Sequence, residues 1–218
     1  MKRLIEFKLF ESENSLKLLL DYVKKFNYNE VKLPFSENKY YSFANNMNPE
    51  IYDKEGYLKD SQYEDGFLYS DGKYCREVIS PYGYLKILKY LFDYNNTFKL
   101  YDLGCGIGNV LYFAKKIGFQ NPIGIESQKE FKKIHDKLNL DIIYGNLLQM
   151  NLNFLQNADI VYLYKPIYDD SLAKKLIDKL LENTKSEVII IYCDPDDYFF
   201  DRKNIISPST MNQYILHK

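Results

Sequence analysis

The 218-residue sequence contains no tryptophan, only two histidines and only three cysteines. Cys75, Cys105 and Cys193 are odd in number and far apart, which argues against a disulfide framework or a zinc cluster. His135 and His217 have no cysteine or histidine neighbours at metal-ligand spacing, so we expect no metal site. His135 falls on the face of a predicted helix, where we expect it at the surface.

The sequence also lacks a charge excess and a long apolar run. Its formal net charge is −1 at pH 7, which gives no strong attraction to nucleic acid or to a membrane surface. No apolar stretch approaches the ~20 residues of a membrane span, and no signal-peptide pattern opens the chain. With 46% apolar residues, the chain is long enough for one well-buried core. We therefore expect a cytoplasmic protein with no membrane association.

Glycine is scarce as well, with ten in the chain, yet three alternate within a short stretch that reads YDLGCGIGN. An apolar stretch from Phe98 precedes them, and apolar residues follow at helical spacing until Gly118. The glycines therefore fall on a strand-to-helix turn. Such a turn requires residues without a Cβ, both for unusual dihedral angles and for close approach of a ligand. The three glycines are Gly104, Gly106 and Gly108.

The spacing of these glycines is G-x-G-x-G, whereas a dinucleotide site has G-x-G-x-x-G. Asp102 lies two residues before the first glycine, where it would repel a pyrophosphate but suits the cationic amino group and sulfonium of S-adenosylmethionine. The stretch from Asp102 to Gly108 resembles motif I of the class I S-adenosylmethionine-dependent methyltransferases. We expect Cys105 to fill space in this loop. The resemblance implies cofactor contacts from Asp102, Gly104, Cys105, Gly106 and Gly108.

A second predicted strand ends in an acid at the spacing expected for a ribose contact. Pro122 to Glu126 forms this strand, and Glu126 lies 18 residues past Gly108. Nucleoside-binding α/β units place a carboxylate at an offset of about 20 residues, where its two oxygens accept from vicinal hydroxyls. Ser127 to Glu130 matches a capping box and predicts that a helix follows. We therefore place Glu126 and Ser127 in the cofactor site.

A third predicted strand, Leu140 to Tyr144, leads into Asn146 and Leu147. Members of the family usually carry a Gly-Asp pair here that contacts the adenine. Asn146 departs from that pattern, but its side-chain oxygen can still accept from the adenine amino group. Taken singly, each of these polar residues could be an ordinary turn or strand-end residue. Their common placement after three successive strands favours a cofactor site that includes Asn146 and Leu147.

Strands and helices alternate from about residue 97 onward, which indicates an α/β fold with a doubly wound, mostly parallel sheet. A helix with leucines at 172, 176 and 180 separates the fourth and fifth strands. Two short strands near the end would complete the seven-stranded Rossmann-like sheet that the resemblance implies. The strands are predicted at 98–102, 122–126, 140–144, 159–164 and 187–193, and then at 205–206 and 213–217.

Residues 1–79 lack this alternation, so we divide the chain into an N-terminal extension over 1–79 and a methyltransferase domain over 80–218. An amphipathic helix is predicted over 14–26. The tyrosine-rich stretch 35–74 has three turn signals, which predict one or two hairpins. These tyrosines offer rigid contact area for a lid, or they reflect a compositional bias that runs through the whole chain.

The fourth strand leads into Tyr164, Lys165 and Pro166. Methyltransferases that act on the amino groups of adenine or glutamine carry Asp/Asn-Pro-Pro-aromatic here, and Tyr164 and Lys165 depart from that pattern. The segment is loosely similar to small protein-lysine methyltransferases, which also follow this strand with a proline and a leucine-rich helix. Tyr164 and Pro166 are therefore the candidate catalytic residues, Tyr164 facing the acceptor and Pro166 shaping its pocket. Alternatively, Tyr164 merely ends a buried strand.

These observations together predict an S-adenosylmethionine-dependent methyltransferase of unidentified acceptor, with a protein side chain or a small molecule favoured over duplex nucleic acid. One alternative is a catalytically silent S-adenosylmethionine-binding module that serves a partner protein. Another is a NAD-type oxidoreductase, against which the glycine spacing and Asp102 both count. Displacement at an activated sulfonium depends mainly on holding nucleophile and methyl about 3 to 3.5 Å apart, so no catalytic triad is expected.

Overall fold

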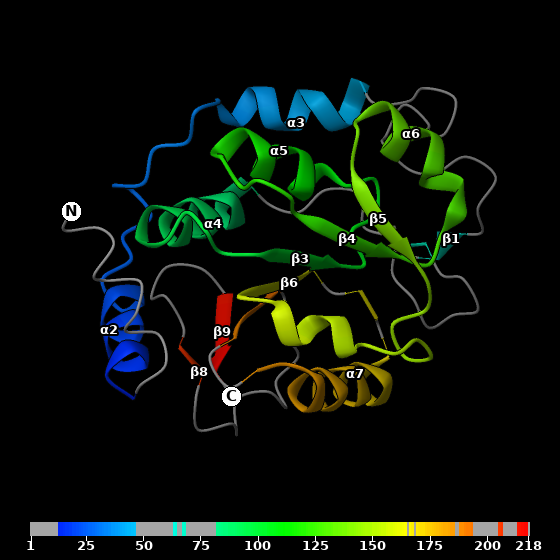
Figure 1. Cartoon of the computed structure of the whole chain (residues 1–218). Coiled ribbons are helices and arrows are strands. Elements are labelled where there is room, and N and C mark those ends of the chain that lie inside the picture. Colours follow the sequence, from blue (N-terminus) through cyan, green and yellow to red (C-terminus); the bar gives the residue numbers. More distant parts are fainter. Residues whose placement is uncertain are drawn as a thin grey trace.

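A single seven-stranded sheet organises the computed structural model, with strand order β5-β4-β3-β6-β7-β9-β8 (Figure 1). The first five of these strands are parallel, as predicted, and β9 and β8 continue the sheet in antiparallel pairing. The strands are β3 (Leu100–Leu103), β4 (Ile123–Glu126), β5 (Asp141–Tyr144), β6 (Ile160–Tyr164), β7 (Ile189–Cys193), β8 (Ile205–Ile206) and β9 (Gln213–His217). The structure describes residues 13–46, 63–64, 67–68, 82–164, 166–167, 169–185, 188–193, 205–206 and 213–217.

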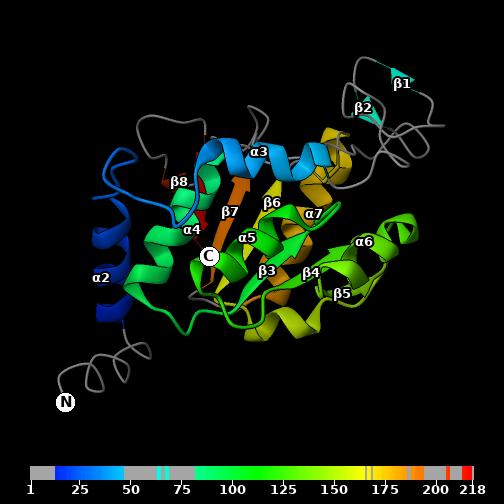
Figure 2. The ribbon, with the colours of Figure 1, turned by 90° about the horizontal axis from the view of Figure 1, so that it is seen from above.

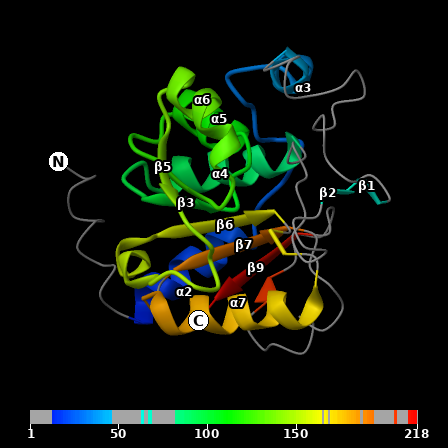
Figure 3. The same ribbon diagram turned by 90° about the vertical axis from the view of Figure 1, so that its right-hand side faces the viewer.

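Helices cover both faces of the sheet (Figure 3). One face carries α4 (Tyr82–Tyr94), α5 (Asn109–Ile117) and α6 (Lys132–Lys137), the last preceded by the short 3-10 helix η2 (Lys129–Phe131). The other face carries α7 (Asp170–Asn183) and the 3-10 helix η3 (Asn153–Asn157). Within the described part of the chain, no helix is both long and apolar enough to cross a membrane.

Strand β6 shows why both faces of the sheet are covered by helices. Its side chains alternate between two apolar clusters, with Ile160 and Tyr162 in one and Val161 and Leu163 in the other. A parallel strand buried on both faces is apolar along its whole length, and β6 carries no charged residue. The neighbouring strand β3 does contain a charged residue, Asp102, and this residue is almost fully buried. A carboxylate in the middle of such a sheet points to a function.

The described part of the N-terminal extension packs onto the same core. Helices α2 (Glu13–Val23) and α3 (Glu37–Asn46) contribute to the apolar cluster that contains α4 and α5. Tyr22 and Tyr90 stack with ring centroids 4.2 Å apart, and each hydroxyl donates to the other residue's carbonyl. Helix α3 lies across α5 on the outside of the molecule (Figure 2). This segment therefore shares a core with the sheet.

The tyrosine-rich segment is described only in part. Strands β1 (Tyr63–Glu64) and β2 (Phe67–Leu68) pair antiparallel on either side of one predicted turn, at 65–66. The other two turn signals, at 55–56 and 71–72, lie outside the described residues. The lid role of this segment stays a prediction.

Candidate functional site

Residues 104–108, which we call the glycine loop, join β3 to α5 at the carboxyl end of the sheet. Gly104, Gly106 and Gly108 have φ angles of 77°, 54° and 79°, in the left-handed region that side chains with a Cβ disfavour. The amides of Gly104 and Cys105 both donate to the Ile125 carbonyl, at 2.8 and 3.1 Å. The loop is therefore tied to β4, the strand that ends in Glu126.

Two glycines also permit close packing from behind the loop. A Cβ on Gly104 would lie 2.6 Å from the Cβ of Pro166, and a Cβ on Gly108 would lie 2.3 Å from Cδ1 of Leu140. Neither position has room for a side chain. Pro166, which follows β6, is thus brought directly against the glycine loop, so the predicted acceptor segment and the predicted cofactor loop meet.

Glu126 is buried at the end of β4 and accepts hydrogen bonds through both oxygens. Oε2 accepts from the Gly106 amide at 2.8 Å, while Oε1 accepts from the Gln128 amide at 2.8 Å and from the Ser127 hydroxyl at 3.3 Å. Burial raises the pKa of the Glu126 carboxyl, and these backbone hydrogen bonds oppose that rise. A carboxylate has about four acceptor sites, so one site remains for a hydroxyl of a ligand diol.

Asp102 has no comparable set of partners. Its side chain is 2% exposed, and its Oδ2 has no hydrogen-bond partner among the described residues. Burial, and then repulsion from Glu126, raise the pKa of Asp102 well above its ordinary value. Buried polar atoms are almost always paired, so an orphaned carboxylate oxygen marks a place where a ligand cation would be stabilised.

The side chain of Cys105 faces inward, under the glycine loop. A Cβ on Gly124 would lie 2.7 Å from its Sγ, so the thiol fills the space that this glycine leaves. Burial, together with the nearby Asp102 and Glu126, raises the pKa of the Cys105 thiol well above its ordinary value. A neutral, buried thiol is not a nucleophile, so only the backbone of Cys105 can serve a ligand.

The turn after β5 is held by its own side chain and by a lysine from α7. Asn146 Oδ1 accepts from the Leu148 amide at 2.9 Å, which fixes the side chain across the turn. Lys179 donates to the carbonyls of Leu147, Leu148 and Met150, at 3.0, 3.0 and 2.6 Å. The Leu147 side chain is buried in the core, so its backbone is the part that a ligand could reach.

Tyr164 is half-buried at the end of β6, with its ring centroid 6.0 Å from that of Tyr84 on α4. The ring therefore packs toward the α4 face of the sheet. Lys165 and Tyr168 lie outside the described residues. A role for Tyr164 toward the acceptor remains a prediction.

The predicted surface position of His135 is wrong, because the side chain is only 1% exposed. Phe131 and Ile134 are both buried on the same short helical segment, and His135 follows one turn after Phe131, on the inner side. Its Nδ1 lies 2.6 Å from the Tyr144 hydroxyl, and its Nε2 lies 2.7 Å from the Gly106 carbonyl oxygen. The apolar spacing around His135 was the sequence feature that could have revealed this.

Sequence reasoning also missed two contacts that support the loops. Tyr40 of α3 is fully buried, and its hydroxyl accepts from Asn109 Nδ2 at 2.8 Å, directly after the glycine loop. The contacts of Lys179 with the turn after β5 were likewise not predicted from the sequence. Among the described residues, no group of three or more histidines, cysteines or acids could hold a metal ion.

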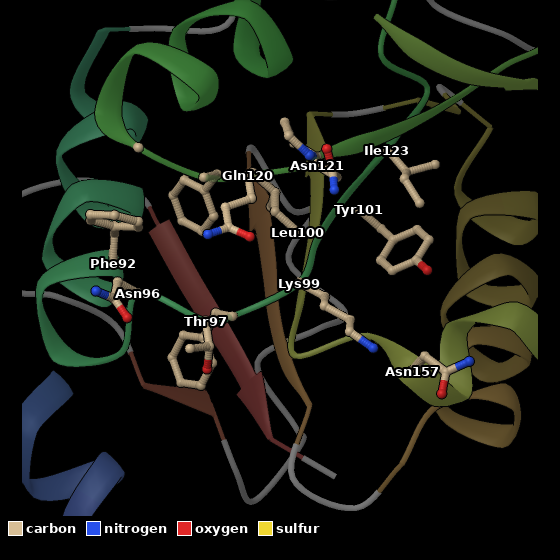
Figure 4. Close-up of a pocket in the computed structure, with 14 residues that line it drawn as sticks. Phe92, Asn96, Thr97, Lys99, Leu100, Tyr101, Gln120, Asn121, Ile123 and Asn157 are labelled. Atoms are coloured by element: carbon tan, nitrogen blue, oxygen red, sulfur yellow. The ribbon is translucent and has the colours of Figure 1, made fainter. Parts of the chain in front are cut away.

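A cavity of about 500 Å³ lies at the opposite end of the sheet (Figure 4). It is lined by Leu100 and Tyr101, where β3 begins, by Ile123, where β4 begins, and by neutral amides such as Gln120 and Asn157. The glycine loop is at the carboxyl ends of these strands, so this cavity is separate from the candidate site. Ligands of open α/β sheets bind at the carboxyl ends.

No family model matches the chain, and no curated protein matches its sequence. An RNA methyltransferase from Salinibacter ruber, solved in complex with S-adenosyl-L-homocysteine, has a TM-score of 0.50 and 21% identity over 64% of this chain and 91% of that chain. The chain has the class I methyltransferase fold.

Two further structures are methyltransferases with lower similarity. A precorrin-6y methyltransferase from Geobacter metallireducens has a TM-score of 0.45 and 15% identity, over 64% of this chain and 77% of that chain. An S-adenosylmethionine-dependent methyltransferase from Clostridium acetobutylicum has a TM-score of 0.37 and 20% identity, over 47% of this chain and 45% of that chain. Within the methyltransferase fold of this chain, the glycine loop, Glu126 and Asn146 follow three adjacent parallel strands.

Proposed function

We propose that this protein is an S-adenosylmethionine-dependent methyltransferase. The observation that carries the proposal is the buried Asp102 carboxyl with an unpartnered oxygen, beside a loop of three left-handed glycines that is tied to Glu126. A buried carboxyl oxygen without a partner among the described residues suits the cationic end of S-adenosylmethionine, and a diol suits the carboxylate of Glu126. The solved Salinibacter enzyme with this fold was crystallised with S-adenosyl-L-homocysteine, which supports the same ligand class.

Each residue would then hold one part of the cofactor. Asp102 would face the amino and sulfonium groups, and the glycine loop would let the cofactor approach the backbone. Glu126, oriented by Ser127, would accept from the ribose hydroxyls. Asn146 would accept from the adenine amino group through its side-chain oxygen, and the Leu147 backbone would lie beside the ring. When bound, the cofactor supplies a methyl group that is already activated for displacement.

The acceptor would bind beside the glycine loop, where Pro166 packs against Gly104. Tyr164 and Pro166 would orient the nucleophile and shape its pocket, because positioning is the main requirement of this chemistry. We infer a protein side chain or a small molecule as the acceptor. The net charge of −1 supports this choice over duplex nucleic acid, which requires a clustered basic surface.

Binding and turnover need separate tests. Calorimetry with S-adenosylmethionine and S-adenosylhomocysteine, in a chelating buffer, should show binding of both, and NAD serves as the negative control. Tight NAD binding with no response to the other two ligands would contradict the proposal. Incubation with methyl-labelled cofactor and a lysate of the source, followed by mass spectrometry, would then identify the methylated acceptor.

A catalytically silent cofactor-binding module is the second candidate. The observation that favours it is that Tyr164 and Lys165, after β6, replace the acid or amide and the first proline that adenine and glutamine methyltransferases carry there. Both candidates predict cofactor binding, so product formation alone separates them. Binding of the cofactor without any labelled product in the lysate would favour the silent module.

A further inference from the structure

Gly106 is held through both of its backbone polar groups by side chains from different elements. Its amide donates to Oε2 of Glu126 at 2.8 Å, and its carbonyl oxygen lies 2.7 Å from Nε2 of His135. Between these two hydrogen bonds the backbone has a φ of 54°. The orientation of the peptide groups around Gly106 is therefore set from the β4 side and from the α6 side at once.

The partners of His135 determine its tautomer. A carbonyl oxygen only accepts, so Nε2 must carry the proton that is donated to Gly106. In the neutral ring Nδ1 is then an acceptor, and the Tyr144 hydroxyl donates to it at 2.6 Å. Burial lowers the pKa of His135, which favours the same neutral form.

These contacts form a closed ring of residues that includes the glycine loop. Tyr144 is the last residue of β5, and in the parallel pairing of β4 with β5 it lies beside Glu126. Starting from Gly106, the contacts run to Glu126, across the sheet to Tyr144, to His135 and back to Gly106. The ring of His135 also lies under the next glycine, since a Cβ on Gly108 would be 3.5 Å from its Cδ2.

We propose that His135 is a positioning residue for cofactor binding, an inference that rests on the proposed function. Acting through Gly106, the neutral imidazole keeps the glycine loop and the Glu126 carboxylate in one arrangement before the cofactor arrives. A site that is already ordered loses less conformational freedom on binding and so binds more tightly. Without this donor, the Gly106 carbonyl would keep only the weak contact from the Cys105 thiol at 4.0 Å, and the loop would adopt other arrangements.

The test compares four variants by cofactor affinity and by thermal stability. His135→Leu removes the donor, whereas His135→Gln offers an amide N–H at about the reach of Nε2. Tyr144→Phe removes the group that fixes the tautomer. Ile134→Val is the matched control, because it trims a buried side chain on the same helix without touching Gly106. All affinities are measured at a temperature at which every variant is folded.

We expect His135→Leu to weaken binding of S-adenosylhomocysteine by about tenfold or more, and His135→Gln to stay within about threefold of wild type. Ile134→Val should lower the melting temperature but leave the affinity unchanged. Equal affinity of wild type and folded His135→Leu would overturn the proposal. If His135→Leu does not fold, the decision passes to Tyr144→Phe, and unchanged affinity despite a mixture of His135 tautomers would overturn the proposal.

Nitrogen NMR of labelled histidine provides a second readout, made simple because the chain has only two histidines. His135 should show a protonated Nε2 and an unprotonated Nδ1 at neutral pH, and Tyr144→Phe should make the two tautomers mix. The reverse tautomer in wild type would overturn the proposal. If wild type binds neither ligand, the proposed function fails, and hydrogen exchange of the Gly106 amide decides the role of His135. Faster exchange in His135→Leu than in Ile134→Val would then support that role, and equal exchange would overturn it.

Discussion

Asp102 is the residue at which folding and ligand binding conflict most directly. Burial raises its pKa well above the ordinary value of 3.8, so the folded state favours the neutral acid. This carboxyl therefore imposes no penalty on folding at pH values below its unfolded pKa. The penalty grows as the pH rises above that value, because the unfolded chain ionises first, and it levels off above the folded-state pKa.

The first prediction is that Asp102→Asn stabilises the free protein relative to wild type at neutral pH, by about 1 to 3 kcal/mol. The difference should shrink as the pH is lowered below the ordinary value of 3.8, where the wild-type carboxyl becomes neutral in the unfolded chain as well. Thermal melts of both proteins across this pH range provide the measurement. Asp21→Asn is the control, since Asp21 is exposed on α2. A stability difference that does not change with pH would show that Asp102 does not titrate as inferred.

The second prediction at the residue scale concerns the contribution of Glu126 to cofactor binding. Glu126→Ala should weaken cofactor binding by about 1.5 to 3 kcal/mol, the range for lost hydrogen bonds to a charged group. Glu126→Gln keeps an acceptor for the diol and should lose less. Calorimetric titration with S-adenosylhomocysteine measures both. Equal affinity of wild type and Glu126→Ala would refute the ribose assignment.

The sequence was informative about residues whose position follows from strand ends. Asp102, Glu126 and Asn146 each come at the end of a short apolar run, and the fold places all three at the carboxyl ends of adjacent parallel strands. His135 was misjudged because its partners, Gly106 and Tyr144, are 29 and 9 residues away. Polarity suggested the surface, and only the tertiary contacts show that both ring nitrogens are satisfied inside.

At the scale of elements, the parallel strands were predicted closely. The fourth strand was predicted at 159–164 and observed as Ile160–Tyr164, because an unbroken apolar run is sufficient evidence for a buried parallel strand. The capping box at Ser127 was wrong. The segment begins as the 3-10 helix η2, whose N-cap, Gln128, makes no side-chain capping hydrogen bond. The helical segment thus begins one residue later than the capping box requires, and the Ser127 hydroxyl donates to Glu126 Oε1 at 3.3 Å.

Helix α7 stabilises the turn after β5 through Lys179, which gives the third prediction. Lys179→Met keeps the apolar stem but removes the donor to three carbonyls, so it should lower the free energy of unfolding by about 1 kcal/mol. Lys175→Met, on an exposed position of the same helix, is the control for the loss of charge. Denaturant titrations of both variants measure the difference. Equal loss in both would mean that the carbonyl contacts contribute nothing.

At the scale of the whole molecule, the N-terminal helices and the sheet share one apolar cluster. Tyr40 packs against Phe113 of α5 and Tyr82 of α4, with ring centroids 4.9 and 5.8 Å apart. The boundary predicted at residue 79 followed the loss of βα alternation, which reports topology but not packing. Side-chain packing between distant segments leaves no periodic trace in one sequence, so this contact could not be foreseen.

The last prediction is that the described N-terminal segment unfolds together with the sheet. Tyr40→Ala would leave a cavity between α3, α4 and α5 and should lower the free energy of unfolding by about 3 to 5 kcal/mol. Tyr40→Phe keeps the ring but leaves Asn109 Nδ2 without its acceptor, so a loss of about 1 to 3 kcal/mol is expected. Because residues 13–46 share the core with α4 and α5, both variants should still melt in a single transition. Hydrogen exchange of α3 and α5, followed by mass spectrometry, provides the measurement. If α3 exchanges freely in wild type while α5 remains protected, the N-terminal segment is a separate unit and the inference is wrong.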